Sequence, residues 1–127
     1  MNRHSILVVE DETLVALDIA EILASTAAND VVIATTIDQA ERDLPADLDF
    51  AVLDIEVIGG RTFDLARRIL ETGASVLFVT GAAMPAIPAD LAAVPVVTKP
   101  YKATDLTRAF YAALKKRRLG RPAPEPV

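Results

Sequence analysis

The sequence contains no cysteine among its 127 residues. Disulfide frameworks and zinc–thiolate sites are therefore both excluded. The absence is typical of a protein that works in a reducing cytoplasm, which is where we expect this one. A chain of this length forms one domain and buries a core without disulfides or a structural metal.

Long hydrophobic runs are also missing, although 52% of the residues are hydrophobic and the mean hydropathy is +0.34. A membrane-spanning helix needs about 20 consecutive apolar residues. The most apolar stretch, 82–97, is interrupted by Pro85, Pro88, Asp90 and Pro95. No signal peptide is visible, because the N-terminus leads directly into a strand-like run. We therefore expect no membrane association.

A basic excess is absent as well, since the net charge is −5. An acidic chain is a poor general binder of nucleic acid, and we expect no DNA-binding domain. The basic run 115–118 is interpreted as the solvated end of the last helix, where cations favour the helix dipole. His4, the only histidine, precedes the first apolar run. We expect it on the solvated surface, and not at a functional site.

Five short apolar runs alternate with amphipathic segments. The runs are residues 5–10, 30–34, 50–54, 75–80 and 94–98. All but the second are nearly continuous in Val, Ile, Leu, Phe or Ala, as in strands covered on both faces of a parallel sheet. The alternation predicts an α/β fold with a doubly wound five-stranded parallel sheet, covered by helices on both faces. For this sheet we expect the strand order 2-1-3-4-5.

Four of the intervening or final segments have helical periodicity. The predicted buried stripe of the first is Leu14, Val15, Ile19, Ile22 and Leu23, interrupted by Asp18. The second helix is predicted over 37–44, the third from Phe63 to a stop at Gly73, and the last over 106–114 after a Thr104 cap.

The fourth crossover, residues 81–93, departs from this regularity. It is rich in alanine but carries Pro85 and Pro88, so we expect an atypical or short fourth helix. Residues 120–127 are rich in proline, and we expect a disordered tail after a domain that covers residues 1–119.

Polar residues end four of the five predicted strands. Glu10 and Asp11 follow the first strand, Asp54 ends the third, Thr80 the fourth, and Lys99 the fifth. The carboxyl ends of parallel strands meet at one edge of the sheet, where ligands of open α/β sheets bind. The first and third strands are neighbours in the predicted order, so the three carboxylates should cluster.

Three clustered carboxylates repel one another unless a cation lies among them. Their oxygen atoms suit Mg²⁺, which also favours a phosphate oxygen as a ligand. Lys99 would contribute a charge to a phosphoryl group, and the Thr80 hydroxyl a directed hydrogen bond. Asp54 as nucleophile would complete the requirements of phosphoryl transfer.

These motifs, in this order, resemble the receiver domain of a response regulator (CheY-like) over about residues 3–119. The family pattern is an acidic pair after the first strand, an acceptor Asp after the third, Thr or Ser after the fourth and Lys-Pro after the fifth. Here these are Glu10-Asp11, Asp54, Thr80 and Lys99-Pro100. The resemblance implies a flavodoxin-like fold and a signalling role in a two-component phosphorelay.

The resemblance also implies individual roles. Asp54 would accept a phosphoryl group from a sensor histidine kinase or a phosphotransfer protein. Asp11 and Asp54 would bind Mg²⁺ together with the main-chain carbonyl of Glu56, and Glu10 would act mostly through a metal-bound water. The Lys99–Pro100 peptide bond is expected to be cis. Such a domain is not an enzyme beyond its own phosphorylation and dephosphorylation.

The chain departs from the family at Val96, where most receivers carry Tyr or Phe. The run Phe78-Val79-Thr80-Gly81 resembles the FAT-GUY receivers, which often act as single domains and whose segment after the fourth strand is mobile. Val79 replaces the alanine of that motif, and its tyrosine is missing. We therefore expect a stand-alone response regulator in which phosphorylation shifts residues 82–93.

Two other functions remain open at this point. One is a pseudo-receiver that binds partners without phosphorylation. The other is a small phosphohydrolase with an Asp nucleophile, although the chain lacks that family's DxD motif after the first strand and has no room for a substrate cap. The downstream partner is unknown, and the apolar composition leaves room for a homodimer.

Overall fold

The computed structural model describes residues 3–26, 29–81 and 85–120. Its elements, in chain order, are β1 His4–Val9, α1 Thr13–Thr26, β2 Asn29–Ala34, α2 Ile37–Arg42, β3 Phe50–Asp54, β4 Glu56–Val57, β5 Gly60–Arg61, α3 Phe63–Glu71, β6 Ser75–Thr80, the 3-10 turn η1 Ala89–Leu91, β7 Val96–Thr98 and α4 Ala103–Gly120.

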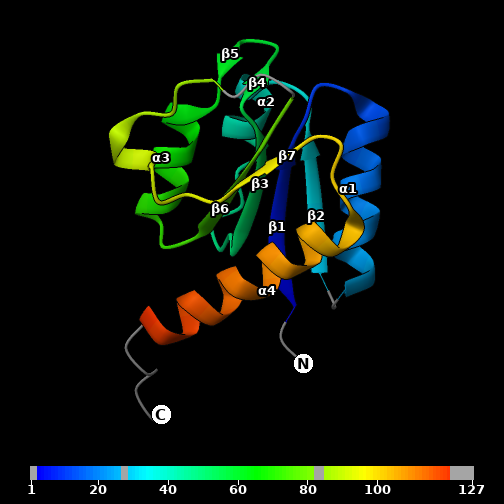
Figure 1. Cartoon of the computed structure of the whole chain (residues 1–127), viewed down its shortest axis with the longest axis vertical. Coiled ribbons are helices and arrows are strands. Elements are labelled where there is room, and N and C mark those ends of the chain that lie inside the picture. The colour runs from blue at the N-terminus through cyan, green and yellow to red at the C-terminus, as the bar shows by residue number, and fades with distance from the viewer. Residues whose placement is uncertain (1–2, 27–28, 82–84, 121–127) are drawn as a thin grey trace.

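The five long strands form one parallel sheet in the order β2-β1-β3-β6-β7 (Figure 1). This confirms the predicted strand order, with β1 and β3 side by side in the middle. Successive strand residues face opposite sides of a sheet. Leu7 of β1 accordingly lies in the core shared with α2, α3 and η1, and Val8 in the core shared with α1 and α4. Both faces are covered, which explains why the strands have continuous apolar sequences.

The prediction for the buried stripe of α1 was partly wrong. Ala16, Ile19 and Leu23 are buried, whereas Leu14 is 82% exposed and Leu17 is also exposed. The spacing 16, 19, 23 defines the face that meets the sheet. Leu14 lies in the first turn of the helix and on another face. The buried stripe was missed because one of its members, Ala16, has a small side chain that contributes little to an apolar pattern.

Two predicted helix ends also differ. The last helix begins at Ala103, so Thr104 lies inside it and is not the cap. Instead the Asp105 carboxylate accepts a hydrogen bond from the backbone N–H of Lys102 at 2.9 Å, as the acidic member of a capping box does. Helix α2 ends at Arg42, two residues before the predicted Leu44.

His4 is half-buried, contrary to the surface position predicted for it. Its ring meets the edge of Phe110 with centroids 5.8 Å apart, and Nδ1 lies 3.9 Å from Oδ2 of Asp49. Phe110 is fully buried and Tyr111 half exposed, so the first belongs to the core and the second faces outward.

The fourth crossover contains, within its described residues 85–95, only the three-residue η1. This confirms the expectation of an atypical fourth helix. The turn is fixed by the fully buried Leu91 and by Arg67, whose guanidinium binds both carboxylate oxygens of Asp90 at 2.8 and 3.1 Å. The predicted disordered tail lies outside the described residues, and no helix among residues 3–26, 29–81 and 85–120 is long and apolar enough to cross a membrane.

Candidate functional site

Three carboxylates meet at the carboxyl edge of the sheet. Glu10 follows β1, Asp54 ends β3, and the two strands pair up to Val9 opposite Leu53. One ligand oxygen each from Glu10, Asp11 and Asp54 lies within 4.8 Å of the other two. The predicted cluster is therefore confirmed, and its all-oxygen donor set fits a hard divalent cation such as Mg²⁺.

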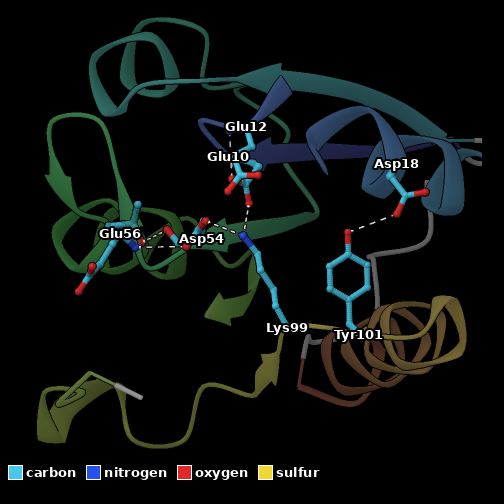
Figure 2. A network of polar contacts seen from close by, with 8 residues as sticks. Glu10, Glu12, Asp18, Asp54, Glu56, Lys99 and Tyr101 are labelled. Atoms are coloured by element: carbon cyan, nitrogen blue, oxygen red, sulfur yellow. Dashed lines mark hydrogen bonds and ion pairs between the residues drawn. The ribbon is translucent and has the colours of Figure 1, made fainter. Parts of the chain in front are cut away.

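Lys99 reaches this cluster from β7 (Figure 2). Its Nζ donates to Oε2 of Glu10 at 2.9 Å and to Oδ2 of Asp54 at 3.0 Å. Its backbone N–H donates to the carbonyl of Thr80 at 2.8 Å, and the Lys99–Pro100 peptide bond is cis, as predicted. Burial lowers the pKa of the Lys99 ammonium, but the hydrogen bonds to Glu10 and Asp54 outweigh it and leave that pKa raised.

Glu10 is almost completely buried, with 1% of its surface exposed. Burial, and to a lesser extent the neighbouring Asp54, raise the pKa of its carboxyl to about 7 against the lowering effect of the hydrogen bonds from Lys99 and from the N–H of Glu12. Its Oε1 accepts a hydrogen bond from the backbone N–H of Glu12 at 3.1 Å. Glu12 is exposed and stands immediately before α1, as expected for a residue at the start of that helix.

The loop after Asp54 is an ordered hairpin. Strands β4 and β5 pair in antiparallel fashion. Gly59, between the two strands, has a φ of 106°, and Gly60, the first residue of β5, has a φ of 126°. A residue with a side chain would be strained at these φ values. The backbone N–H of Glu56 donates to Oδ1 of Asp54 at 3.3 Å (Figure 2). The main chain of Glu56 thus lies beside Asp54, as its predicted role requires, while its side chain is exposed. The role of its carbonyl as a ligand stays a prediction.

Thr62 is a positioning residue that the sequence interpretation missed. It is fully buried, and its hydroxyl donates to the main-chain carbonyl of Asp54 at 2.9 Å. Its N–H donates to the carbonyl of Ile55 at 3.0 Å, which closes the hairpin loop. A threonine directly before α3 is typical of a helix cap, yet the Thr62 side chain makes no capping hydrogen bond. Its hydrogen bond to the Asp54 carbonyl becomes visible only in the folded loop.

Thr80 ends β6 next to the acceptor strand, one residue beyond the pair Asp54 and Val79. It is 4% exposed. Among the described residues, its hydroxyl has no hydrogen-bond partner, so it is available to an anion at this edge. The structure brings Thr80 to the site from β6 and Lys99 from β7, as the sequence predicted.

Tyr101 makes a contact that the sequence did not reveal. Its hydroxyl donates to Oδ2 of Asp18 at 3.4 Å, which links the loop after Lys99 to helix α1 (Figure 2). Burial and the nearby Asp18 carboxylate raise the pKa of the Tyr101 phenol to about 12. The two residues are 83 positions apart, and no local pattern signals their contact.

Solved structures with a similar fold were found, whereas no family model and no curated protein matches the sequence. A CheY-like response regulator receiver domain from Methanospirillum hungatei JF-1 superposes with a TM-score of 0.81 at 22% identity, over 93% of this chain and 98% of that one. The non-phosphorylated HemR receiver domain from Leptospira biflexa superposes with a TM-score of 0.68 at 27% identity, over 97% and 99%. The chain has the receiver fold.

The receiver fold also occurs as part of longer neighbours. NtrX from Brucella abortus, solved in complex with ADP, has a TM-score of 0.73 at 24% identity, over 93% of this chain but only 28% of that one. The solved neighbours thus include chains about as long as this one and a much longer chain of which the fold is only one part. The similarity establishes the flavodoxin-like, CheY-like architecture, and the roles of individual residues rest on the geometry above.

Proposed function

We propose that the protein is a stand-alone response regulator that accepts a phosphoryl group on Asp54. The observation that carries this proposal is the convergence of Asp54 with Lys99, Glu10 and Asp11 at one sheet edge, with Thr80 on the adjacent strand. The donor would be a sensor histidine kinase or a phosphotransfer protein. Kinases of this kind use ATP, so the proposal places the protein in the cytoplasm.

The reaction would be a phosphoryl transfer from a phosphohistidine. A carboxylate oxygen of Asp54 attacks phosphorus, the P–N bond breaks, and the imidazole nitrogen leaves with the bonding electron pair. Lys99, released from its bonds to Glu10 and Asp54, would neutralise charge on the phosphoryl oxygens. The Thr80 hydroxyl would donate a hydrogen bond to one of them.

Asp11 and Asp54 would hold a Mg²⁺ ion together with the main-chain carbonyl of Glu56, and Glu10 would assist through a bound water. When bound, the cation supplies positive charge that offsets the carboxylates and the phosphoryl group. The carboxylates of Glu10, Asp11 and Asp54 suit this role because one oxygen of each lies within 4.8 Å of the other two. Lys99 compensates two of them, Glu10 and Asp54, which explains how these coexist in a largely buried site.

In most receivers a Tyr or Phe on the last strand changes position on phosphorylation and signals that state to partners. This chain would not use that residue, because Val96 on β7 takes its place. We propose a FAT-GUY type of response, in which the segment after Thr80 moves. Leu91 and the Arg67–Asp90 pair fix the later part of the crossover, which favours a movement confined to residues near Gly81. Residues 82–84, within the segment predicted to shift, lie outside the described residues.

The test is incubation with acetyl phosphate and Mg²⁺, followed by intact mass measurement. We expect one labile phosphoryl adduct in the natural chain and none in Asp54→Asn. The variant Asp38→Asn, which changes an exposed carboxyl on α2, is the matched control and should be modified normally.

Each other outcome favours a different function. A chain that takes up no phosphoryl group from acetyl phosphate or from a phosphorylated kinase would be a pseudo-receiver. Continuous release of phosphate from phosphate esters would indicate a phosphohydrolase. An adduct that persists in Asp54→Asn would exclude Asp54 as the acceptor.

A further inference from the structure

An apolar groove lies between α4, the end of α3 and the edge formed by β6 and β7. Its volume is about 890 Å³, a usual size for a binding cleft, and no residue of the carboxylate site lines it. Helix α4 contributes small side chains to the lining, Ala109, Ala112 and Ala113, which leave space beside the strands. An apolar groove of this size marks a binding surface.

The wall of the groove includes backbone groups without hydrogen-bond partners. The N–H of Ser75 donates to the carbonyl of Asp49 at 3.1 Å, so the backbone of Ser75 faces the β3 side of β6. Because strand residues alternate, the N–H and C=O of Val76 face the opposite side, where Phe78 pairs with β7. Val76 is 3% exposed, and neither group has a partner within the part of the chain that the structure describes. Buried backbone groups are nearly always paired in native proteins, so these two favour a binding partner that completes the strand edge.

The sequence explains why β7 does not cover these groups. If β7 began earlier in its present register, Val94 would lie opposite Val76. The N–H of residue 95 would then donate to the C=O of Val76, but this residue is Pro95, which has no N–H. The chain turns away instead, and the N–H of Val94 donates to the carbonyl of Leu91 in η1 at 3.0 Å. The edge of β6 is therefore open at Val76 and closed from Phe78 onward.

The rim of the groove carries positive charge. Arg108 and Lys116 of α4 both line it, and neither forms an ion pair with another described residue. The acids of the lining are engaged, since Asp90 binds a guanidinium of α3 at 2.8 Å and Asp105 accepts a backbone N–H. In a chain of net charge −5, this local excess of positive charge favours an acidic occupant.

We propose that the groove binds an extended, acidic segment of a partner protein, which joins the sheet as a strand beside β6. One side of an extended segment presents N–H and C=O groups, so the segment satisfies both backbone groups of Val76. Its apolar side chains cover the lining, and its carboxylates pair with Arg108 and Lys116. The proposal concerns a surface away from Asp54 and goes beyond the proposed function.

Two other occupants fit this chemistry less well. A lipid-like carboxylic acid pairs with Arg108 through its ionised head, but a carboxylate has no proton to donate to the C=O of Val76. A second copy that packs groove against groove in a two-fold dimer brings Arg108 and Lys116 of both copies to one interface, where like charges repel. Of the three occupants, only a peptide supplies donors, acceptors and negative charge together.

Titration of the isotope-labelled full chain with a synthetic peptide provides the direct test by nuclear magnetic resonance. The probe is a capped hexapeptide of alternating valine and glutamate, in which the two side-chain types lie on opposite faces of a strand. We expect the Val76 amide signal to shift, and its hydrogen exchange to slow about tenfold when the free peptide is at about ten times its Kd. Amides of α2 should be unaffected. A probe that does not bind, or that binds without slowing exchange at Val76, would overturn the proposal.

Methylation of the peptide nitrogens separates strand pairing from simple charge attraction. Two derivatives carry N-methyl groups on every valine or on every glutamate, which leaves the charge of the peptide unchanged. Alternate N–H groups of a strand point to opposite sides, so one derivative should lose about tenfold in affinity and the other little. Equal affinity of the two derivatives would rule out a strand beside β6.

The charge contacts are tested on α4. Arg108→Gln and Lys116→Gln should each weaken binding of the probe about two- to fivefold, and a peptide of alternating valine and lysine should bind far more weakly than the glutamate peptide. Lys115→Gln, which changes an exposed residue of α4 outside the groove, is the matched control and should bind the probe normally. Equal affinity of all three variants for the probe would contradict an acidic occupant.

Two further measurements distinguish the other occupants. If the Val76 signal shifts with protein concentration alone and sedimentation shows a dimer, a second copy is the occupant and the proposal is wrong. The same holds for a lipid-like acid if decanoate slows exchange at Val76 and the peptide does not. Phosphodonors and Mg²⁺ are left out of these titrations, so the outcome does not depend on phosphorylation of Asp54.

Discussion

Replacing Glu10 with glutamine should stabilise the protein at neutral pH, although it removes one partner of an ion pair. Burial raises the pKa of Glu10 from 4.5 to about 7. A raised carboxyl pKa means that the folded protein binds the proton more tightly than the unfolded chain does. The stability that this gives is present in full below the unfolded pKa and is lost as the pH rises through 4.5 toward 7.

The magnitude follows from the shift. One pKa unit corresponds to about 1.4 kcal/mol, so ionised Glu10 costs up to about 3.4 kcal/mol of unfolding free energy, and about 3 kcal/mol at pH 7, where it is half protonated. Glutamine mimics the neutral carboxyl without this cost. It accepts one hydrogen bond fewer, from Lys99 or Glu12, which subtracts about 1 kcal/mol. The expected net gain is about 2 kcal/mol.

The assay is urea unfolding followed by far-UV circular dichroism, in a chelator that removes divalent cations. The gain from Glu10→Gln should shrink by about 1.5 kcal/mol between pH 7 and pH 5.5, because the natural carboxyl becomes protonated over that interval. The control Glu12→Gln changes an exposed neighbour and should stay within about 0.5 kcal/mol of the natural chain at both values. A Glu10→Gln variant that is less stable at pH 7, or whose gain does not vary with pH, would refute the reasoning.

Three other predictions concern the same site and its surroundings. Mg²⁺ affinity, measured by calorimetry, should fall by up to about tenfold per pH unit below 7, because the charge of the cation favours the ionised form of Glu10 over the protonated one; an affinity independent of pH would contradict this. Thr62→Val leaves the carbonyl of Asp54 without its 2.9 Å donor and should cost about 1–3 kcal/mol in urea unfolding, whereas an unchanged midpoint would show that the bond is dispensable. Leu91→Ala should cost about 2–5 kcal/mol by thermal unfolding, against less than about 1 kcal/mol for Arg67→Gln, whose ion pairs are exposed; equal losses would mean that charge, and not burial, fixes η1.

Much of the site could be predicted because, in a parallel sheet, the end of a strand in the sequence also fixes the edge of the sheet at which that residue lies. Residues that end the strands of such a sheet meet at one edge whatever the loops between them do. Glu10, Asp11, Asp54, Thr80 and Lys99 were found in this way. The contact between Tyr101 and Asp18 was not found, because it joins a loop to a helix face, and neither end is marked by a repeating pattern.

The helix faces show where local pattern reading fails. Leu14 fitted an apolar stripe by spacing alone, yet it is 82% exposed. Helix α1 has a short run of apolar residues on more than one face, and only the sheet selects the face of Ala16, Ile19 and Leu23. His4 likewise has no local signal for its position beside Phe110, which lies on a helix 106 positions later in the sequence.

The sequence alone determined the alternation of strands and helices, the covered sheet faces and the identity of the residues at the carboxyl edge, since apolar runs and their polar ends are local properties of the chain. The tertiary structure decided what those residues do to one another. Lys99 lies between Glu10 and Asp54 at 2.9 and 3.0 Å, and burial raises the pKa of Glu10 to about 7. It also decided that the short fourth crossover leaves part of β6 unpaired beside α4. The distances between these side chains, their burial and the unpaired strand edge arise only when distant segments pack together. No single stretch of the sequence determines them.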